Sequence, residues 1–140
     1  MTLKIEEEKI DFEPMNDEDL PEITRIVQNI WTMGADKLRE DRYGQIGGKS
    51  WKEWSAERIK KALSSDNTYA YVTRVDGELA AFCSYTCQGE TKIGEIGYNG
   101  VKPEYSGLGL GTYQMQEILD AMRDMDLKIA EVTTGLNEGH

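Results

Sequence analysis

The sequence predicts an α/β (α+β) fold in which helices flank a mixed, mostly antiparallel sheet. Three observations predict it. Two amphipathic helical patterns precede three β-rich segments, the dipeptide Asp76-Gly77 between the first two segments is typical of a tight hairpin, and a further helical pattern precedes a final β-rich segment. The expected order is therefore β-α-α-β-β-β-α-β. With 140 residues, of which 39% are hydrophobic, we expect a single domain over residues 1–140.

The first predicted elements are a strand and a helix. Residues 9–15 alternate in polarity and predict the strand. Asn16 or Asp17 can cap the helix that follows. The apolar side chains of this helix recur at helical spacing: Leu20, Ile23, Ile26, Val27, Ile30 and Trp31.

A second helix is expected before the β-rich part of the chain. Ser50 and Glu53 form a capping-box pattern, which predicts that this helix begins near residue 50. Residues 33–49 combine a short helical stretch with a glycine-rich segment, and they show no pattern that identifies an acceptor pocket.

The second half predicts three strands, a helix and a last strand. The three strands are expected at residues 68–75, 79–87 and 92–101. The third is rich in glycine, which indicates a bulge or the close approach of another backbone. The helix is expected over residues 111–125, and residues 128–136 should pair in parallel with the strand before it. The apolar stripe of this helix consists of Met115, Ile118, Leu119 and Met122.

Charge and hydropathy exclude several function classes. The net charge is −10, from 26 acidic and 16 basic residues, and both halves of the chain are acidic. Such a surface repels nucleic acid and anionic lipid, and it favours a cationic partner such as an amine. The sequence has neither an apolar run of membrane-spanning length nor a cleavable leader pattern. We therefore expect a cytoplasmic protein that binds neither nucleic acid nor a membrane.

The cysteines and the histidine indicate neither a disulfide nor a metal site. Cys83 and Cys87 lie on one predicted strand, about 13 Å apart at a rise of about 3.3 Å per residue, which is too far for a disulfide. We expect two reduced thiols. His140 is the single histidine, so a zinc site would lack ligands.

The segment "VKPEYSGLGLGT", residues 101–112, places Gly107, Gly109 and Gly111 between a predicted strand and a predicted helix. Such a loop exposes backbone N–H groups at the positive end of a helix dipole, which makes an anion site suited to a pyrophosphate. The Walker loop needs a lysine after its last glycine, and none follows here. The dinucleotide pattern G-x-G-x-x-G fails because these glycines alternate.

The loop resembles the acetyl-CoA signature of the GCN5-related N-acetyltransferase (GNAT) family, V-x-P-x-x-[RQ]-G-x-G-x-[GA]. Val101, Pro103 and the three glycines match it, and only Ser106 differs, where the family has Arg or Gln. The order of elements over residues 8–140 is also similar to that of the family. A serine brings no charge and less reach to this position, which bears on cofactor affinity.

The resemblance implies acetyl-CoA as co-substrate, with no metal, and a set of cofactor-binding residues. Asn99, Gly100 and Val101 would pair with the pantetheine amides. Asn137 would hydrogen-bond the pantetheine arm, although it could equally be a turn residue. The backbone N–H groups that would hold the pyrophosphate are those of Ser106, Gly107, Leu108, Gly109, Leu110, Gly111 and Thr112.

The resemblance also implies direct transfer of an acetyl group to a primary amine of a small molecule or protein. Glu95 is the candidate base, because it lies six residues before Val101, where some protein-acetylating members place a carboxylate. Its other interpretation is a solvent-facing strand residue. Tyr98 is the second catalytic candidate, as a residue lining the acyl pocket, and Tyr85 is the nearby alternative. Either tyrosine could instead belong to the core.

The family pattern continues beyond this sequence with a fourth helix, whose tyrosine often protonates the leaving thiolate, and two strands. Because these elements are lacking here, no general acid can be assigned, and the fifth strand would have an open edge. We expect either a shortened domain or a homodimer that covers this edge. A catalytically weak or inactive domain that binds acetyl-CoA or a partner is the alternative function.

Overall fold

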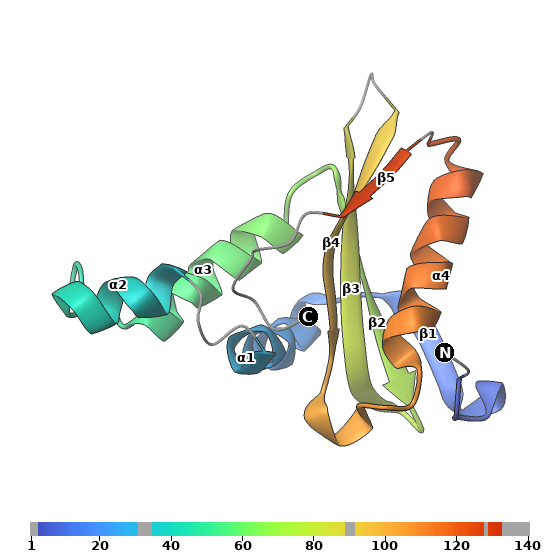
Figure 1. The fold of residues 1–140 in the computed structure, drawn as a ribbon, viewed down its shortest axis with the longest axis horizontal. Coiled ribbons are helices and arrows are strands. Elements are labelled where there is room, and N and C mark those ends of the chain that lie inside the picture. Colours follow the sequence, from blue (N-terminus) through green and yellow to red (C-terminus); the bar gives the residue numbers. More distant parts are fainter. Residues whose placement is uncertain (1–2, 31–34, 89–91, 128, 133–140) are drawn as a thin grey trace.

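The protein folds as one β-sheet with helices on both faces. The computed structural model describes residues 3–30, 35–88, 92–127 and 129–132. Helices α1, α2 and α3 lie on one side of the sheet and α4 on the other (Figure 1). The predicted fold class is confirmed. The strands are β1 (Ile10–Pro14), β2 (Thr68–Val75), β3 (Glu78–Gln88), β4 (Ile93–Val101) and β5 (Ile129–Val132), and the helices are α1 (Leu20–Ile30), α2 (Ala35–Tyr43), α3 (Trp51–Leu63) and α4 (Leu110–Asp124).

The sheet has the strand order β1-β2-β3-β4-β5. Strands β1 to β4 pair antiparallel, whereas β5 lies parallel to β4, as predicted. The β2–β3 hairpin turns at Asp76 (φ 51°) and Gly77 (φ 84°). Two consecutive positive φ angles match the right-handed twist of the strands, so the hairpin prediction is confirmed.

Side-chain capping boxes form at the turn before α1 and at the start of α3. Asn16 accepts from the Glu18 backbone N–H, and Asp19 accepts from the Asn16 backbone N–H, which closes a capping box at a short 3-10 turn leading into α1. Ser50 and Glu53 form the predicted capping box of α3. These reciprocal bonds satisfy N–H groups that a helix N-terminus leaves without partners.

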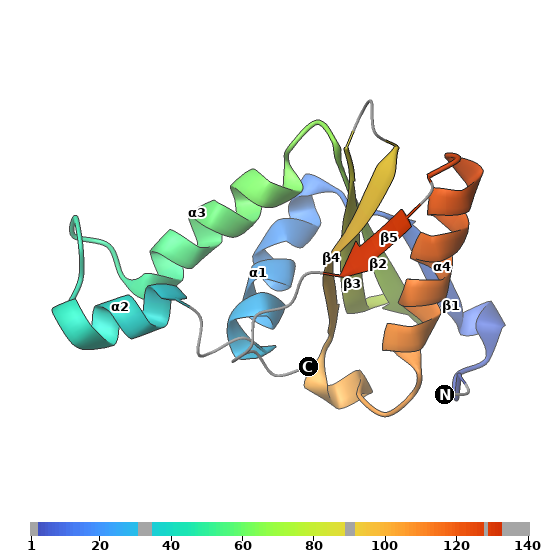
Figure 2. The same cartoon turned by 45° about the horizontal axis from the view of Figure 1, so that its top comes forward.

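Two features of the helices differ from the prediction. Residues 35–43 form a full helix, α2, which packs against α3 and extends away from the sheet (Figure 2). In α4 the buried row is Leu110, Gln114, Ile118 and Met122, whereas Met115 and Leu119 are only half-buried. The predicted stripe contains Ile118 and Met122 of this row, but a search for apolar residues misses Gln114.

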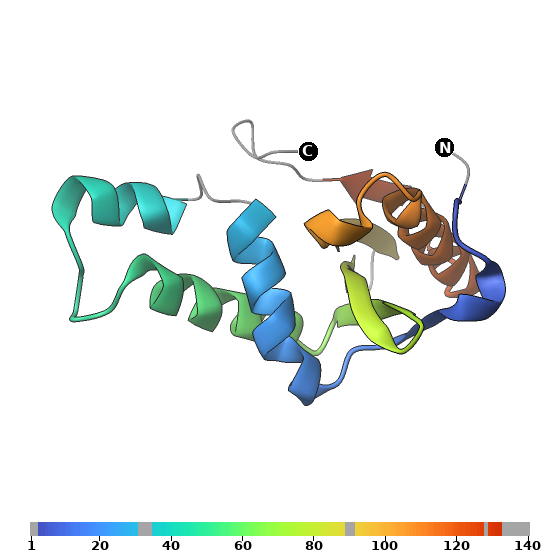
Figure 3. The ribbon, with the colours of Figure 1, turned by 90° about the horizontal axis from the view of Figure 1, so that it is seen from below.

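Successive side chains of β3 point to opposite faces of the sheet, and they pack into two cores, one on each face. Phe82 is fully buried with Ile23 and Ile26 of α1 and Ile59 of α3. Its neighbour Cys83 is fully buried on the α4 face, in a cluster with Tyr85, Ile96, Ile118 and Met122. Figure 3 shows α4 and the group α1 to α3 on opposite sides of the strands.

One partly buried ion cluster joins β1, β2 and the 3-10 turn that precedes α1. Arg74 Nη2 donates to both carboxylate oxygens of Asp19, at 2.8 and 3.0 Å, and Arg74 Nε donates to Glu13 at 2.5 Å. The Asp19 side chain is only 9% exposed. The hydrogen bonds to these carboxylates raise the pKa of Arg74 above its ordinary value, so the guanidinium stays charged.

Replacing Asp19 should therefore destabilise the protein strongly. Asp19→Ala would leave the Arg74 charge short of a partner and remove half of the capping box, and we expect a loss of about 2–4 kcal/mol in the free energy of unfolding. Urea unfolding measures it. Asp120→Ala, which breaks an exposed ion pair with Arg123, is the matched control and should change stability by less than about 0.5 kcal/mol. Equal losses in both variants would contradict the prediction.

Candidate functional site

The loop between β4 and α4 has the backbone of an anion-binding turn. Pro103–Tyr105 form a 3-10 turn, Gly107 follows with φ +78°, and Gly109 is the N-cap of α4 with φ +89°. Both φ angles lie in the left-handed region that favours glycine. A Cβ at Gly107 would meet no atom within 4 Å, so the space beside this residue is open to a ligand.

The N-terminus of α4 suits a negatively charged guest. Its first turn contains no acidic residue, and Gly109 supplies no side-chain cap. The first N–H groups of a helix have no partner within the helix, and the helix dipole adds positive potential there. Leu110 is buried, which anchors the helix start against the core. The loop geometry therefore fits a pyrophosphate.

Ser106 replaces neither the charge of the family's Arg nor the reach of its Gln. Its hydroxyl donates to the Pro103 carbonyl at 2.8 Å, within the 3-10 turn. The backbone N–H of Ser106 donates to the same carbonyl at 3.1 Å. To bind the cofactor as predicted, the Ser106 hydroxyl or N–H would have to give up its hydrogen bond to the Pro103 carbonyl.

Strand β4 offers backbone groups on the edge away from β3. The Lys102 N–H donates to the Ala80 carbonyl at 2.9 Å, which marks a hydrogen-bonded pair at the end of the β3–β4 ladder. Such pairs alternate with non-hydrogen-bonded pairs along an antiparallel ladder. Asn99 and Val101 occupy the alternate positions, so their N–H and C=O groups point to the β5 side.

Within the described residues, the pairing of β4 with β5 covers only part of that edge. In the described residues it runs from Ile93–Ile129 to Ile96–Val132. The backbone groups of Asn99 and Val101 lie beyond this paired stretch. An extended ligand with amide groups could pair with them as a further strand would.

A bulge divides β4 directly after Ile96, the last β4 residue that pairs with β5 in the described part of the chain. Gly97 and Tyr98 face the single residue Ser84 of β3, and the Ser84 hydroxyl accepts from the Tyr98 N–H at 3.1 Å. A Cβ at Gly97 would lie 2.8 Å from the Ser84 oxygen, so glycine leaves room for that hydroxyl. The glycine-rich sequence predicted this bulge, but it gave no signal for Ser84.

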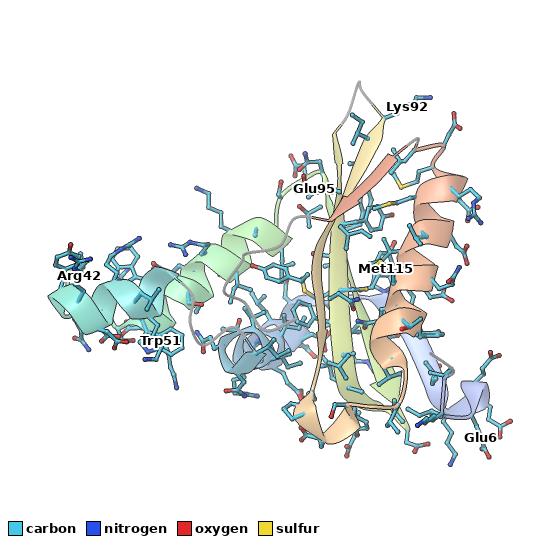
Figure 4. The ribbon with its side chains drawn as sticks, in the orientation of Figure 1. Glu6, Arg42, Trp51, Lys92, Glu95 and Met115 are labelled. Carbon is cyan, nitrogen blue, oxygen red and sulfur yellow. The ribbon has the colours of Figure 1, made fainter. Side chains whose placement is uncertain are left out.

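The structure places both predicted catalytic residues, Glu95 and Tyr98, on β4. Glu95 lies on β4, half-buried, on the side of the sheet that α3 occupies, whereas Met115 of α4 lies on the other side (Figure 4). Tyr98 packs against the α1/α3 core, with its ring 5.6 Å from that of Phe82. Glu95 and Tyr98 thus share one strand and one face.

Tyr85, the alternative to Tyr98, lies in a different environment. It is only 1% exposed on the α4 face, and its hydroxyl donates to the Met125 sulfur at 3.2 Å. Burial raises the pKa of Tyr85 well above its ordinary value. The structure therefore makes Tyr85 a core residue. Asn137 lies outside the described residues.

Gln114 is a residue near the site that sequence analysis missed. It is fully buried on α4 and hydrogen-bonded to Asn99. The signal that could have found it is its position midway between Leu110 and Ile118, four residues from each.

The described ranges contain no group of three or more His, Cys, Asp or Glu side chains that could hold a metal ion. No helix in the same ranges combines the length and the apolar character that a membrane span requires.

Comparison with known proteins places the chain in a family. The family model described as "Acetyltransferase (GNAT) family" matches residues 24–139. The chain therefore belongs to the GNAT acetyltransferase family, as the motif and the order of elements predicted. No curated protein matches the sequence in a search of such proteins.

Solved acetyltransferases share the fold. PaiA N-acetyltransferase from Thermoplasma acidophilum, in complex with coenzyme A, has a TM-score of 0.65 and 14% identity, over 91% of this chain and 80% of that one. Ribosomal-protein-alanine N-acetyltransferase from Brucella melitensis biovar Abortus 2308 has a TM-score of 0.64 and 13% identity, over 91% and 81%. An aminoglycoside acetyltransferase from an uncultured soil metagenomic sample has a TM-score of 0.58 and 13% identity, over 93% and 80%.

The two cysteines, which form no disulfide, should differ in reactivity. Burial, and secondly the charge of Glu117, raise the pKa of the Cys83 thiol to about 12, while Cys87 is half-buried. A raised pKa leaves Cys83 without thiolate at pH 8. With a chromogenic disulfide reagent we expect Cys87 to react first and Cys83 only after unfolding in urea. Equal rates for both thiols would contradict this, and a Cys87→Ser variant assigns the fast phase.

Proposed function

We propose that this protein is an acetyl-CoA-dependent N-acetyltransferase whose acceptor is a primary amine of a small molecule or a protein. The observation that carries the proposal is the loop at Gly107 and Gly109. It presents the N-terminus of α4 next to the part of the β4 edge that lies beyond the β5 pairing in the described residues. Two structural neighbours are named as acetyltransferases of ribosomal-protein alanine and of aminoglycosides, and both names point to amine acceptors.

In this proposal the chain holds coenzyme A through its backbone. The N–H groups around Gly107 to Thr112 bind the pyrophosphate, and the α4 dipole supports its negative charge. The N–H and C=O groups of Asn99 and Val101 pair with the pantetheine amides. A neighbour with the same fold is described in complex with coenzyme A, which supports this choice of ligand.

Glu95 would take the proton that the acceptor amine loses. The amine nitrogen attacks the thioester carbonyl, the new C–N bond forms, the C–S bond breaks, and the thiolate takes a proton from solvent. Glu95 lies on β4 two residues before the bulge at Gly97, so an amine approaching from the α3 side reaches the carboxylate. The net charge of −10 would attract such a cationic acceptor.

A domain that binds acetyl-CoA without transferring its acetyl group is the second candidate. The observation that favours it is Ser106, which supplies no positive charge and whose hydroxyl is already bonded to Pro103. Calorimetry with coenzyme A and acetyl-CoA, followed by a thiol-release assay with a panel of amines, separates the two candidates. Binding with turnover supports the transferase, binding without turnover on any amine supports the second candidate, and no binding at millimolar ligand overturns both.

A methyl group at Gly107 should block the pyrophosphate. Gly107→Ala places a Cβ in the open space beside the loop, and we expect the affinity for coenzyme A to fall at least about tenfold by calorimetry. Gly77→Ala is the matched control, because Gly77 has a similar φ of +84° and equally open surroundings in the β2–β3 hairpin. Both variants should lose about 1 kcal/mol of stability through the positive φ. Unchanged affinity in Gly107→Ala would show that the loop does not hold the phosphates.

Removing the carboxylate of Glu95 should lower turnover and leave binding intact. For Glu95→Gln we expect kcat to fall about 10²-fold or more at neutral pH, with the affinity for acetyl-CoA unchanged within about twofold. Glu57→Gln, an exposed carboxylate on α3, is the control and should keep wild-type kcat. A Glu95→Gln variant with normal kcat would assign Glu95 to the ordinary sheet surface.

A further inference from the structure

A chain of polar side chains crosses the core beneath the proposed cofactor site. The hydroxyl of Thr73 on β2 donates to Gln114 Oε1 at 2.8 Å. Gln114 Nε2 donates to the Phe82 carbonyl and to Asn99 Oδ1, both at 2.9 Å. Asn99 Nδ2 then donates to the Gly111 carbonyl at 3.2 Å. Thr73, Gln114 and Asn99 are here called the Gln114 network.

The Gln114 network is costly to bury unless it is fully satisfied. Thr73 and Gln114 are each 0% exposed. An unpaired buried amide or hydroxyl costs about 1–3 kcal/mol. An apolar side chain at position 114 would continue the row of Leu110 and Ile118, but it would remove the acceptor of the buried Thr73 hydroxyl. In the described residues every buried side-chain polar atom has a partner. The amide therefore adds directional bonds that an apolar residue could not make.

The hydrogen bonds of the Gln114 network involve both halves of the proposed site, namely the pantetheine edge of β4 and the pyrophosphate end of α4. Asn99 belongs to the stretch of β4 whose N–H and C=O groups face the pantetheine side. Gly111 belongs to the first turn of α4, whose N–H groups face the pyrophosphate side. The Asn99 side chain joins the two directly, and Gln114 fixes the orientation of the Asn99 amide.

We infer that Gln114 is a positioning residue that sets the register between the pantetheine edge of β4 and the pyrophosphate end of α4. The inference rests on the proposed function, since it assumes that one ligand engages both places. A linked ligand gains affinity only if its two sites are held at the matching separation. Loss of the Gln114 network should therefore weaken intact coenzyme A more than a fragment that uses one half.

Gln114→Met tests this, because methionine is close to glutamine in size and in helix propensity but cannot replace its hydrogen bonds. The probes are coenzyme A and adenosine 3′-phosphate 5′-diphosphate, which carries the pyrophosphate without pantetheine. We expect the Kd for coenzyme A to rise about tenfold or more, and the Kd for the nucleotide to change by less than about threefold. Ile59→Val, a buried change in α3 on the other face, controls for general loss of stability and should leave both values unchanged.

The Kd values of the two ligands support or overturn the role inferred for Gln114. Equal weakening of both ligands, or unchanged binding of both, overturns it and leaves the proposed function standing as long as the wild type binds coenzyme A. A wild type that fails to bind coenzyme A overturns both proposals. If Gln114→Met does not fold, Asn99→Ser serves instead, because it breaks the link to Gly111 and keeps the bonds of Gln114 to Thr73 and Phe82. The same selective loss for coenzyme A is expected there.

Discussion

The site depends on one constraint, which is that β4 is paired with β3 along its length but with β5 only between Ile93 and Ile96 in the described structure. Backbone N–H and C=O groups on an unpaired strand edge can hydrogen-bond to an extended chain or ligand. A glycine-containing loop connects the end of β4 to α4. The N-terminus of α4 therefore lies next to the stretch of the β4 edge beyond the described β5 pairing. One extended, anionic ligand can satisfy both.

The positions of the glycines follow from this arrangement. Gly107 and Gly109 have positive φ angles that let the loop turn into α4, while Gly97 makes room for Ser84 in the bulge. The strand and the helix that meet at the loop must also keep a fixed separation. Apolar packing of Leu110 and Ile118 holds α4 on the sheet, and the bonds of Gln114 add direction to that packing.

Much of the fold could be predicted because its signals are local. The Ser50 capping box, the Asp76-Gly77 hairpin and the strand-loop-helix at Gly107 each depend on residues close together in sequence. The Arg74–Asp19 pair and the Thr73–Gln114 bond join residues that are 55 and 41 positions apart, and no pattern of composition or spacing reveals them. Glu95 was selected only from its spacing of six residues before Val101 of the loop motif, and its role stays a prediction.

By itself, the sequence determined the order of the elements apart from α2, the turn chemistry and the family. Caps, turns and the glycine loop are fixed by the backbone preferences of single residues, so they can be read without the fold. The tertiary structure decided which side of the sheet each side chain faces and, within the described residues, where the pairing of β4 with β5 ends. It also decided that Gln114, in an otherwise apolar row, lies between Thr73 and Asn99. These are properties of packed elements, since a buried polar bond forms only when strands and a helix from distant parts of the chain are brought together.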